Sequence, residues 1–331
     1  MALGKPAKEQ LLVTSEGGKL LQLDVASGQY RVLYEHPQGE SVFGVTSIGD
    51  RVYLSGATFV ASGQLSDGAL QRCSLRVPFR IPLRGDLRRG MRWLWSKLGA
   101  HARVLSYDKP GLHQLNVYGS SVYIAATSWN EVWELDLDLN LKQRRPVEPH
   151  ILDYFHLNNV FCDGLHYYVC LNRYAGRPGP GGYAKFDLAW NEVERRAVGW
   201  ESHAFAVIDH RMFQLCCFSW RSKAVSEHPR KAGLMVEDKV VFEYDPEQYF
   251  CKDFSMDDEH VFIVGGTNTP REKRAKAVGI VFILNRKFEL LDRCVIEGLG
   301  GFNACRLLGL DHTRGHAPFA RALPARHADA A

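Results

Sequence analysis

The sequence predicts an all-β protein, a six-bladed β-propeller whose N- and C-terminal strands share the closing blade. Three observations lead to this prediction. One unit of apolar strands and turns recurs at a spacing of roughly 45 residues. Each copy offers about four short strands whose hydrophobic residues alternate with a period of two. The first and last copies are incomplete in complementary ways, as expected of a ring closed by its own two ends.

The bulk composition fits one folded domain. The chain has 331 residues, of which 46% are apolar and 24% charged. We expect a single domain over residues 1–310, because closed all-β folds often reach this length as one unit. A net charge of +4 gives no reason to expect a nucleic-acid partner. The sequence shows neither a secretory signal nor an apolar run that could span a bilayer, so we expect a cytoplasmic protein.

Eight cysteines are present, and none forms a CxxC pair. Most lie in apolar strand-like runs such as YYVCL and FQLCCF. We interpret them as reduced core residues, with a disulfide framework as the alternative.

The repeat is clearest in stretches that begin with an aromatic, histidine or lysine residue and end in a small polar cluster. These copies start at Phe43, His113, His156, His203 and Lys252. The copies at Phe43, His113 and His203 place an aromatic residue at the same distance downstream. The copy at His156 needs a slip of one residue to match them.

The two ends of the chain complete one blade between them. The chain opens with three strand candidates, LLVTSE, KLLQLDVA and YRVLYE, and closes with one, GGFNACRLLGL, from Gly300 to Leu310. Pairing these segments would remove two free sheet edges. The count is then six blades, with five and seven as alternatives.

Two segments lie outside the repeat. Residues 72–111 are predicted to be an insertion containing a basic amphipathic helix, because Arg72–Arg103 holds nine Arg and Lys residues and a single acid, Asp86. We interpret it as a lid or packed helix, with contact of residues 85–99 to an anionic membrane surface as the alternative. The tail, residues 311–331, is expected to be disordered.

Propeller topology predicts where a site should form. The innermost strand of each blade begins at one face of the ring. The loop between the second and third strands of the blade returns to that same face. Three copies place a histidine at this face, namely His113, His156 and His203, and three converging imidazoles can hold one divalent ion such as Zn, Fe, Mn or Ca. Asp253 or Asn303, from neighbouring blades, could be a fourth ligand or could orient one, and Asp253 could assist catalysis. The alternative is that these histidines hydrogen-bond a neighbouring blade or a ligand.

The loops of the same face combine aromatic, amide and guanidinium groups, which suits a polar and anionic small molecule. The predicted substrate-binding residues are Trp129, Asn130, Asn172, Arg173, Tyr174, Trp220, Arg221, Asn268 and Asn303. No GxSxG, P-loop or Rossmann fingerprint stands between a strand and a helix, so no nucleotide cofactor is expected.

The stretch HLNNVFCDGLHYYV, from His156, resembles the inner-strand pattern of six-bladed propellers of the NHL and gluconolactonase-like group. The resemblance implies a hydrolase or lyase with a divalent metal at the channel mouth. His113, His156 and His203 would imitate the three-histidine site of the peptidyl-hydroxyglycine lyase type. The gluconolactonase type uses a carboxylate and amides instead, and this chain has Phe43 where an early acidic ligand would stand.

These observations together predict a propeller enzyme of hydrolase or lyase type that acts on a polar, anionic small molecule. His113, His156, His203 and Asp253 are the predicted catalytic groups. One alternative is a metal-free isomerase or lyase that uses the same histidines. Another is a non-catalytic propeller that binds a protein or a membrane surface through its top face and basic helix.

Overall fold

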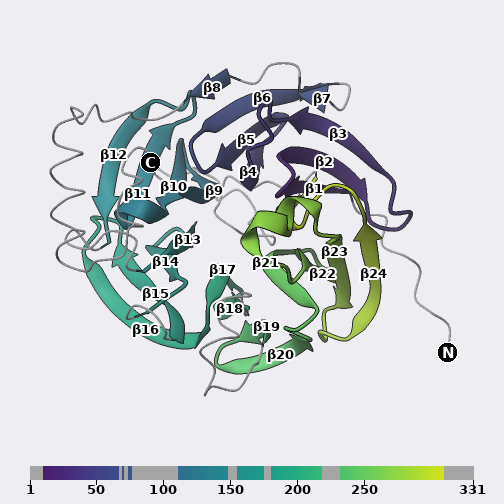
Figure 1. The fold of residues 1–331 in the computed structure, drawn as a ribbon. Coiled ribbons are helices and arrows are strands. Elements are labelled where there is room, and N and C mark those ends of the chain that lie inside the picture. The colour runs from purple at the N-terminus through teal and green to yellow at the C-terminus, as the bar shows by residue number, and fades with distance from the viewer. Residues whose placement is uncertain are drawn as a thin grey trace, which may run out of the picture.

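Six antiparallel sheets surround a central axis as the blades of a propeller (Figure 1). The computed structural model describes residues 10–66, 69–70, 74–76, 111–147, 155–174, 180–217 and 232–308, and the six sheets are those formed within these ranges. The predicted all-β, six-bladed fold is therefore confirmed, and the five- and seven-bladed alternatives are wrong.

Five blades are built from strands that follow one another in the chain. From the axis outward, the second blade contains β4 (Val42–Ile48), β5 (Arg51–Gly56) and β6 (Val60–Ser66), and both β7 (Ala69–Leu70) and β8 (Ser74–Arg76) pair with β6. The third contains β9 (Leu112–Tyr118), β10 (Ser121–Ala126), β11 (Glu131–Asp136) and β12 (Leu141–Pro146). The fourth contains β13 (Leu157–Cys162), β14 (His166–Leu171), β15 (Pro180–Asp187) and β16 (Glu192–Trp200). The fifth contains β17 (Ser202–Ile208), β18 (Arg211–Cys216), β19 (Ala232–Val236) and β20 (Lys239–Tyr244). The sixth contains β21 (Tyr249–Met256), β22 (His260–Thr267), β23 (Gly279–Asn285) and β24 (Leu290–Ile296).

The first blade joins the two ends of the chain, as the sequence predicted. Its order is β25-β1-β2-β3, so β25 (Phe302–Leu307) is the inner strand and β1 (Gln10–Ser15), β2 (Lys19–Asp24) and β3 (Tyr30–Glu35) follow outward. The Leu308 amide donates to the Gln10 carbonyl at 2.9 Å. This pairing closes the ring and leaves neither terminal strand as a free edge.

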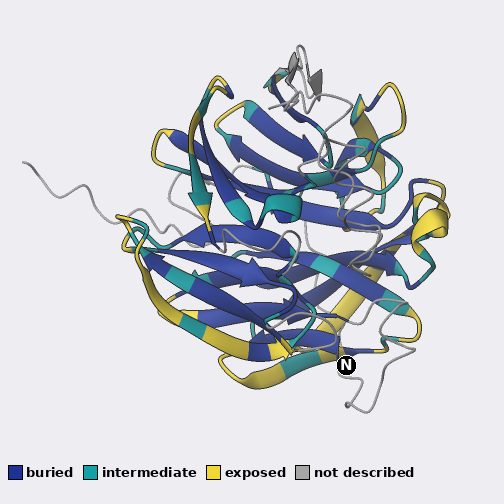
Figure 2. Cartoon of the chain, turned by 60° about the vertical axis from the view of Figure 1, so that its left-hand side comes forward, coloured by how far each residue is buried: buried dark blue, intermediate teal, exposed yellow. Residues whose placement is uncertain are grey.

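In the blades whose outer strand is described, the outermost strand is the most exposed of the four. The inner strand β13 is buried throughout, whereas the outer strands β16 and β24 are mostly exposed (Figure 2). Apolar side chains of neighbouring blades pack face to face, as Phe161, Phe205 and Phe254 do in the cluster that joins the fourth, fifth and sixth blades. Burial of these sheet faces is the main source of stability, and it fixes the inner strands around the axis.

The structure changes one predicted boundary. Strand β8 lies within the predicted insertion of residues 72–111, but it pairs with β6 and belongs to the second blade. Residues 74–76 of the predicted insertion are therefore part of the second blade's sheet. Its basic helix and the predicted disordered tail, residues 311–331, lie outside the described residues.

The cysteines that the structure describes are buried and free, as predicted. The described part of the chain also contains no helix that is both long and apolar enough to cross a membrane.

Candidate functional site

A cavity of about 260 Å³ lies on the axis, at the end where the inner strands begin. Each of the six inner strands contributes to its lining, and so does the loop between β22 and β23. That loop contains the short helix η4 (Arg271–Lys276), of which Arg271 and Arg274 line the cavity. This is the face at which sequence reasoning placed the site.

A β-bulge in each inner strand directs side chains into the cavity. In β4, for example, Val42 pairs with Gly56 and Gly44 pairs with Ser55, so Phe43 is an extra residue in the ladder. A bulge bends the strand and re-aims the side chain of the extra residue. The extra residues of the other inner strands are Asn158, His203, Lys252 and Asn303, and in β9 the extra residue falls at His113–Gln114. All of them line the cavity.

This register corrects the alignment of the fourth repeat. The bulge residue of β13 is Asn158, not His156, and Asn158 stands 45 residues before His203. His156 precedes the strand with a φ of 52°, and its side chain nevertheless lines the same cavity. A constant spacing of 45 residues from His113 through Asn158 to His203 was therefore the signal that the sequence analysis missed.

The three predicted histidines share the cavity with two phenylalanine rings. His113 stacks on Phe43 with ring centroids 5.0 Å apart and meets His156 edge-on at 5.1 Å. His203 lies edge-on to Phe250 at 5.1 Å. The structure thus brings His113, His156 and His203 together, although they are far apart in the sequence.

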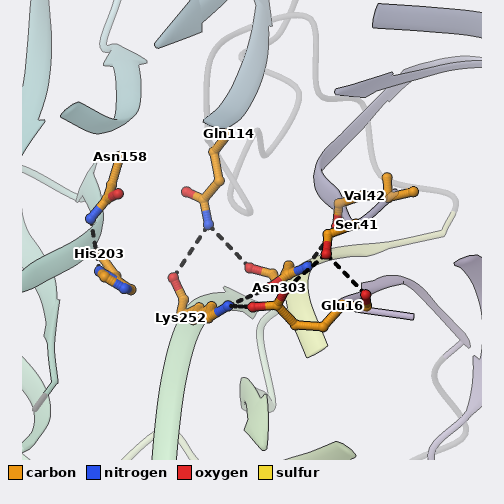
Figure 3. A network of polar contacts seen from close by, with 8 residues as sticks. All are labelled: Glu16, Ser41, Val42, Gln114, Asn158, His203, Lys252 and Asn303. Carbon is orange, nitrogen blue, oxygen red and sulfur yellow. Dashed lines mark hydrogen bonds and ion pairs between the residues drawn. The ribbon is translucent and has the colours of Figure 1, made fainter. Parts of the chain in front are cut away.

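Two asparagine amides hold the ring of His203. The Asn158 side-chain nitrogen lies 2.7 Å from His203 Nδ1, and the Asn172 nitrogen lies 3.2 Å from it (Figure 3 shows the Asn158 contact). The same two amide nitrogens donate to the Ser202 carbonyl, at 2.8 Å and 3.4 Å. Asn158 and Asn172 are both buried, so the contacts are shielded from solvent.

A lysine–glutamate pair forms the opposite wall. The Lys252 ammonium donates to the Glu16 carboxylate and, at 2.6 Å, to Asn303 Oδ1 (Figure 3). Ser41 Oγ also donates to Glu16, at 2.9 Å. Burial opposes the charge of both partners. Burial lowers the pKa of Lys252. Burial also acts to raise the pKa of Glu16, but the attraction of the Lys252 ammonium outweighs this and holds the pKa of Glu16 below its usual value.

Burial and neighbouring side chains lower the pKa of two of the imidazoles. Burial is the largest cause that lowers the pKa of His113 and of His203 well below its usual value. The neighbouring histidines His156 and His203 lower the pKa of His113 further, and the charges of Lys252 and Arg271 add to this. Lys252, His156 and Arg274 lower the pKa of His203 in the same way. Both histidines are therefore neutral near pH 7.

Gln114 bridges the ring beneath the cavity. Its amide nitrogen donates across the axis to the carbonyls of Lys252 and Asn303, at 3.3 Å and 3.5 Å (Figure 3). Its amide oxygen accepts a hydrogen bond from Asn159 at 2.6 Å. Gln114 therefore ties the third blade to the fourth, the sixth and the first at the level of the axis.

Asp253, a predicted catalytic residue, does not line the cavity. It is fully buried between β21 and β25, where Arg306 Nη1 donates to its carboxylate at 2.6 Å and the Cys305 amide donates at 3.1 Å. Successive side chains of a strand point to opposite faces, so the residue after Lys252 turns away from the axis. Its contacts are those of a structural ion pair.

Of the predicted substrate-binding residues, Asn172 and Asn303 line the cavity. The others that the structure describes do not. The ring of Trp129 lies under Arg144, whose guanidinium carbon is 5.1 Å away, and Asn130 Oδ1 accepts from the Phe155 amide at 3.2 Å. Arg173, Tyr174 and Asn268 also lie outside the lining, with Asn268 donating to the Pro246 carbonyl at 2.7 Å. Trp220 and Arg221 lie outside the described residues.

Sequence reasoning missed several lining residues, but a signal existed for some of them. Glu16 lies in the loop between β1 and β2, which are the second and third strands of the closing blade. The loop rule used for the other blades therefore points to it. Arg271 and Arg274 follow the predicted loop cluster by a few residues. Glu201 precedes β17 in a left-handed conformation with φ of 41°, for which the sequence carries no evident signal.

Within the described ranges, no group of three or more His, Cys, Asp or Glu residues is placed so that it could hold a metal ion. The predicted divalent metal stays a prediction.

Comparison with known proteins identifies the fold but no family. No family model and no curated protein matches the chain. A chain of a nidogen/laminin complex matches with a TM-score of 0.54 and 8% identity, covering 90% of this chain and 97% of that one. A protein of unknown function from Bacteroides caccae matches with a TM-score of 0.58 and 9% identity, covering 92% and 100%. These neighbours support the propeller fold, and nothing among them supports the NHL or gluconolactonase-like group specifically.

Proposed function

We propose that this propeller binds a small anionic organic molecule in its axial cavity and acts on it by acid–base chemistry of hydrolase or lyase type. The observation that carries the proposal is the cavity lining, where the cations Lys252, Arg271 and Arg274 stand around the buried imidazoles of His113 and His203. The lining also holds the carboxylates of Glu16, Glu201 and Glu272, of which Glu16 is already engaged by the Lys252 ammonium. An anion placed beside these cations and the neutral histidines would be attracted by all three positive charges.

The histidines supply the chemistry in this proposal. A bound anion stabilises an adjacent imidazolium, so the pKa of a histidine that it touches returns toward its usual range. His113 and His156 lie edge-to-face at 5.1 Å, which lets one accept a proton from the substrate while the other donates one. Phe43 and Phe250 provide apolar walls for the rest of the molecule.

Anion binding can be tested by thermal shift. We expect inorganic phosphate or a simple carboxylate such as citrate to raise the melting temperature of the wild type in a saturable manner. Lys252→Gln and Arg274→Gln should weaken that binding at least tenfold. Lys287→Gln is the matched control, because Lys287 is exposed on the β23–β24 turn. Equal responses in all four proteins, or no response in the wild type, would contradict the proposal.

The alternative role is docking of a macromolecular partner. It is favoured by the fold shared with a chain of a nidogen/laminin complex and by the basic segment at residues 85–99. Sedimentation with anionic phosphatidylserine vesicles tests the membrane form of this role. Wild-type protein that pellets with the vesicles, and a variant lacking residues 85–99 that stays in the supernatant, would support it. Equal pelleting of the two would dismiss it.

A further inference from the structure

We infer that Asn158 and Asn172 fix His203 as a neutral imidazole with its proton on Nε2, so that the cavity offers a hydrogen-bond donor at this position and not a metal ligand. The inference deepens the proposed function, because it assigns His203 to binding the anion and leaves acid–base chemistry to His113 and His156. The tautomer itself does not depend on any ligand.

The Ser202 carbonyl determines which way the two amides face. A carbonyl oxygen can only accept a hydrogen bond, so the group placed 2.8 Å from it must be the amide nitrogen of Asn158. Rotating this amide by 180° would put its oxygen against the carbonyl oxygen. Asn172 repeats the arrangement, with its nitrogen 3.4 Å from the same carbonyl. Both side chains therefore present N–H groups to His203.

The orientation of the amides determines the state of the imidazole. Nδ1 of His203 faces two N–H donors, at 2.7 Å and 3.2 Å, so it must carry a lone pair. A neutral ring with a lone pair on Nδ1 holds its single proton on Nε2. Protonating Nδ1 would direct an N–H group at two others inside a buried contact, which also disfavours the imidazolium form.

This arrangement has the wrong polarity for a metal site. A histidine that binds a metal usually donates its second ring N–H to a carboxylate or a carbonyl oxygen. At His203, that second nitrogen meets amide N–H groups instead. Freeing the Nε2 lone pair for a metal would move the proton to Nδ1 and break both contacts. A ligand with an acceptor oxygen, such as a carboxylate, is what Nε2–H can bind.

Nitrogen-15 NMR of the histidine rings tests the inference directly. In full-length protein labelled at histidine and held at pH 7.5 without ligand, we expect His203 to show a protonated Nε2 and an unprotonated Nδ1. Loss of its signals in His203→Gln assigns them. His36 is an internal reference, because its Nδ1 accepts backbone N–H groups of Gln38 and Glu40 at 3.3 Å and 3.1 Å.

Two variants add a matched comparison. Asn158→Asp replaces an N–H donor with a carboxylate, so we expect the proton of His203 to move to Nδ1 or the ring to become charged. Asn303→Asp adds the same charge at the corresponding bulge of β25 and should leave the His203 tautomer unchanged. A wild-type proton on Nδ1, a charged wild-type ring, or equal shifts in both variants would overturn the inference. If a variant does not fold, the wild-type spectrum decides alone. If the protein proves not to bind anions, the inference about the His203 tautomer is unaffected.

Discussion

Asp253 and Arg306 form an ion pair inside the wall between the sixth blade and the closing blade. Arg306 is 2% exposed and Asp253 is fully buried, so water cannot replace either partner. Removing one charge leaves the other desolvated, which costs far more than losing an exposed pair. The pair therefore links the first and last blades of the ring through a single contact at 2.6 Å.

Asp253→Asn should lower the free energy of unfolding by about 3–5 kcal/mol, because it removes the charge of the buried carboxylate that pairs with the Arg306 guanidinium. Urea denaturation measures the change. Asp238→Asn is the control, since Asp238 pairs with Arg196 on the surface and such pairs contribute little. A loss at Asp253 no larger than that at Asp238 would show that the buried pair is not important for stability.

Stability should fall as the pH drops below about 6.5, the usual histidine value. The folded-state pKa values of His113 and His203 are depressed by burial, so the unfolded chain binds more protons in this range. Each histidine should cost about 1.4 kcal/mol per pH unit below that value. His203→Gln should reduce the slope of unfolding free energy against pH, because it removes one of the two buried imidazoles. Parallel slopes for His203→Gln and the wild type would refute this.

At the scale of the element, close approach between inner strands sets the width of the ring. Gly44 of β4 faces β9 so closely that an added Cβ would lie 2.9 Å from Gln114 Cα and 2.6 Å from Ser55 Oγ. The backbone of a neighbouring blade cannot yield as a flexible side chain can. A side chain at this position must therefore push β4 away from β9 or distort one of them.

Gly44→Ala should destabilise the protein by about 1–3 kcal/mol, the usual cost of overpacking. Chemical denaturation gives the value. Gly49→Asn is the comparison variant, because Gly49 lies in an open turn with a φ of 51° that asparagine tolerates. If the two substitutions cost the same, the β4–β9 contact does not constrain the ring.

The elements also show what the sequence could and could not predict. Strand periodicity and repeat spacing were sufficient to predict the six blades. The topology of the blades was then sufficient to predict at which face the cavity lies. The bulges were not predicted, and one extra residue in a strand decides which side chain faces the axis. That is why Asn158 replaced His156 in the repeat and Asp253 turned away. The pairing of Glu16 with Lys252 joins opposite ends of the chain, so no local pattern could indicate it.

At the scale of the whole molecule, strand pairing within the closing blade holds the ring shut. Strand β1 pairs with both β2 and β25, and the hydrogen bond from Leu308 to Gln10 places the two ends of the described chain side by side. Opening the ring therefore requires breaking a complete strand ladder. In a propeller whose blades were each continuous, only the packing between blades would resist opening.

A circular permutant tests how much the composite closing blade contributes to stability. Joining residue 331 to residue 1 and opening the chain at the exposed Gln38–Gly39 turn would make every blade continuous. We expect the permutant to fold, because all blade contacts are kept, and to unfold at a lower urea concentration than the wild type. An unchanged midpoint would mean that the composite blade adds nothing to the stability of the ring.

The bulges separate the part of each inner strand that builds the scaffold from the part that meets a ligand. Each blade contributes one such position, and the extra residue there has no partner in the adjoining ladder. These positions are accordingly a compact target for protein engineering. A combinatorial library confined to them would present new sets of chemical groups around one axis on an unaltered framework.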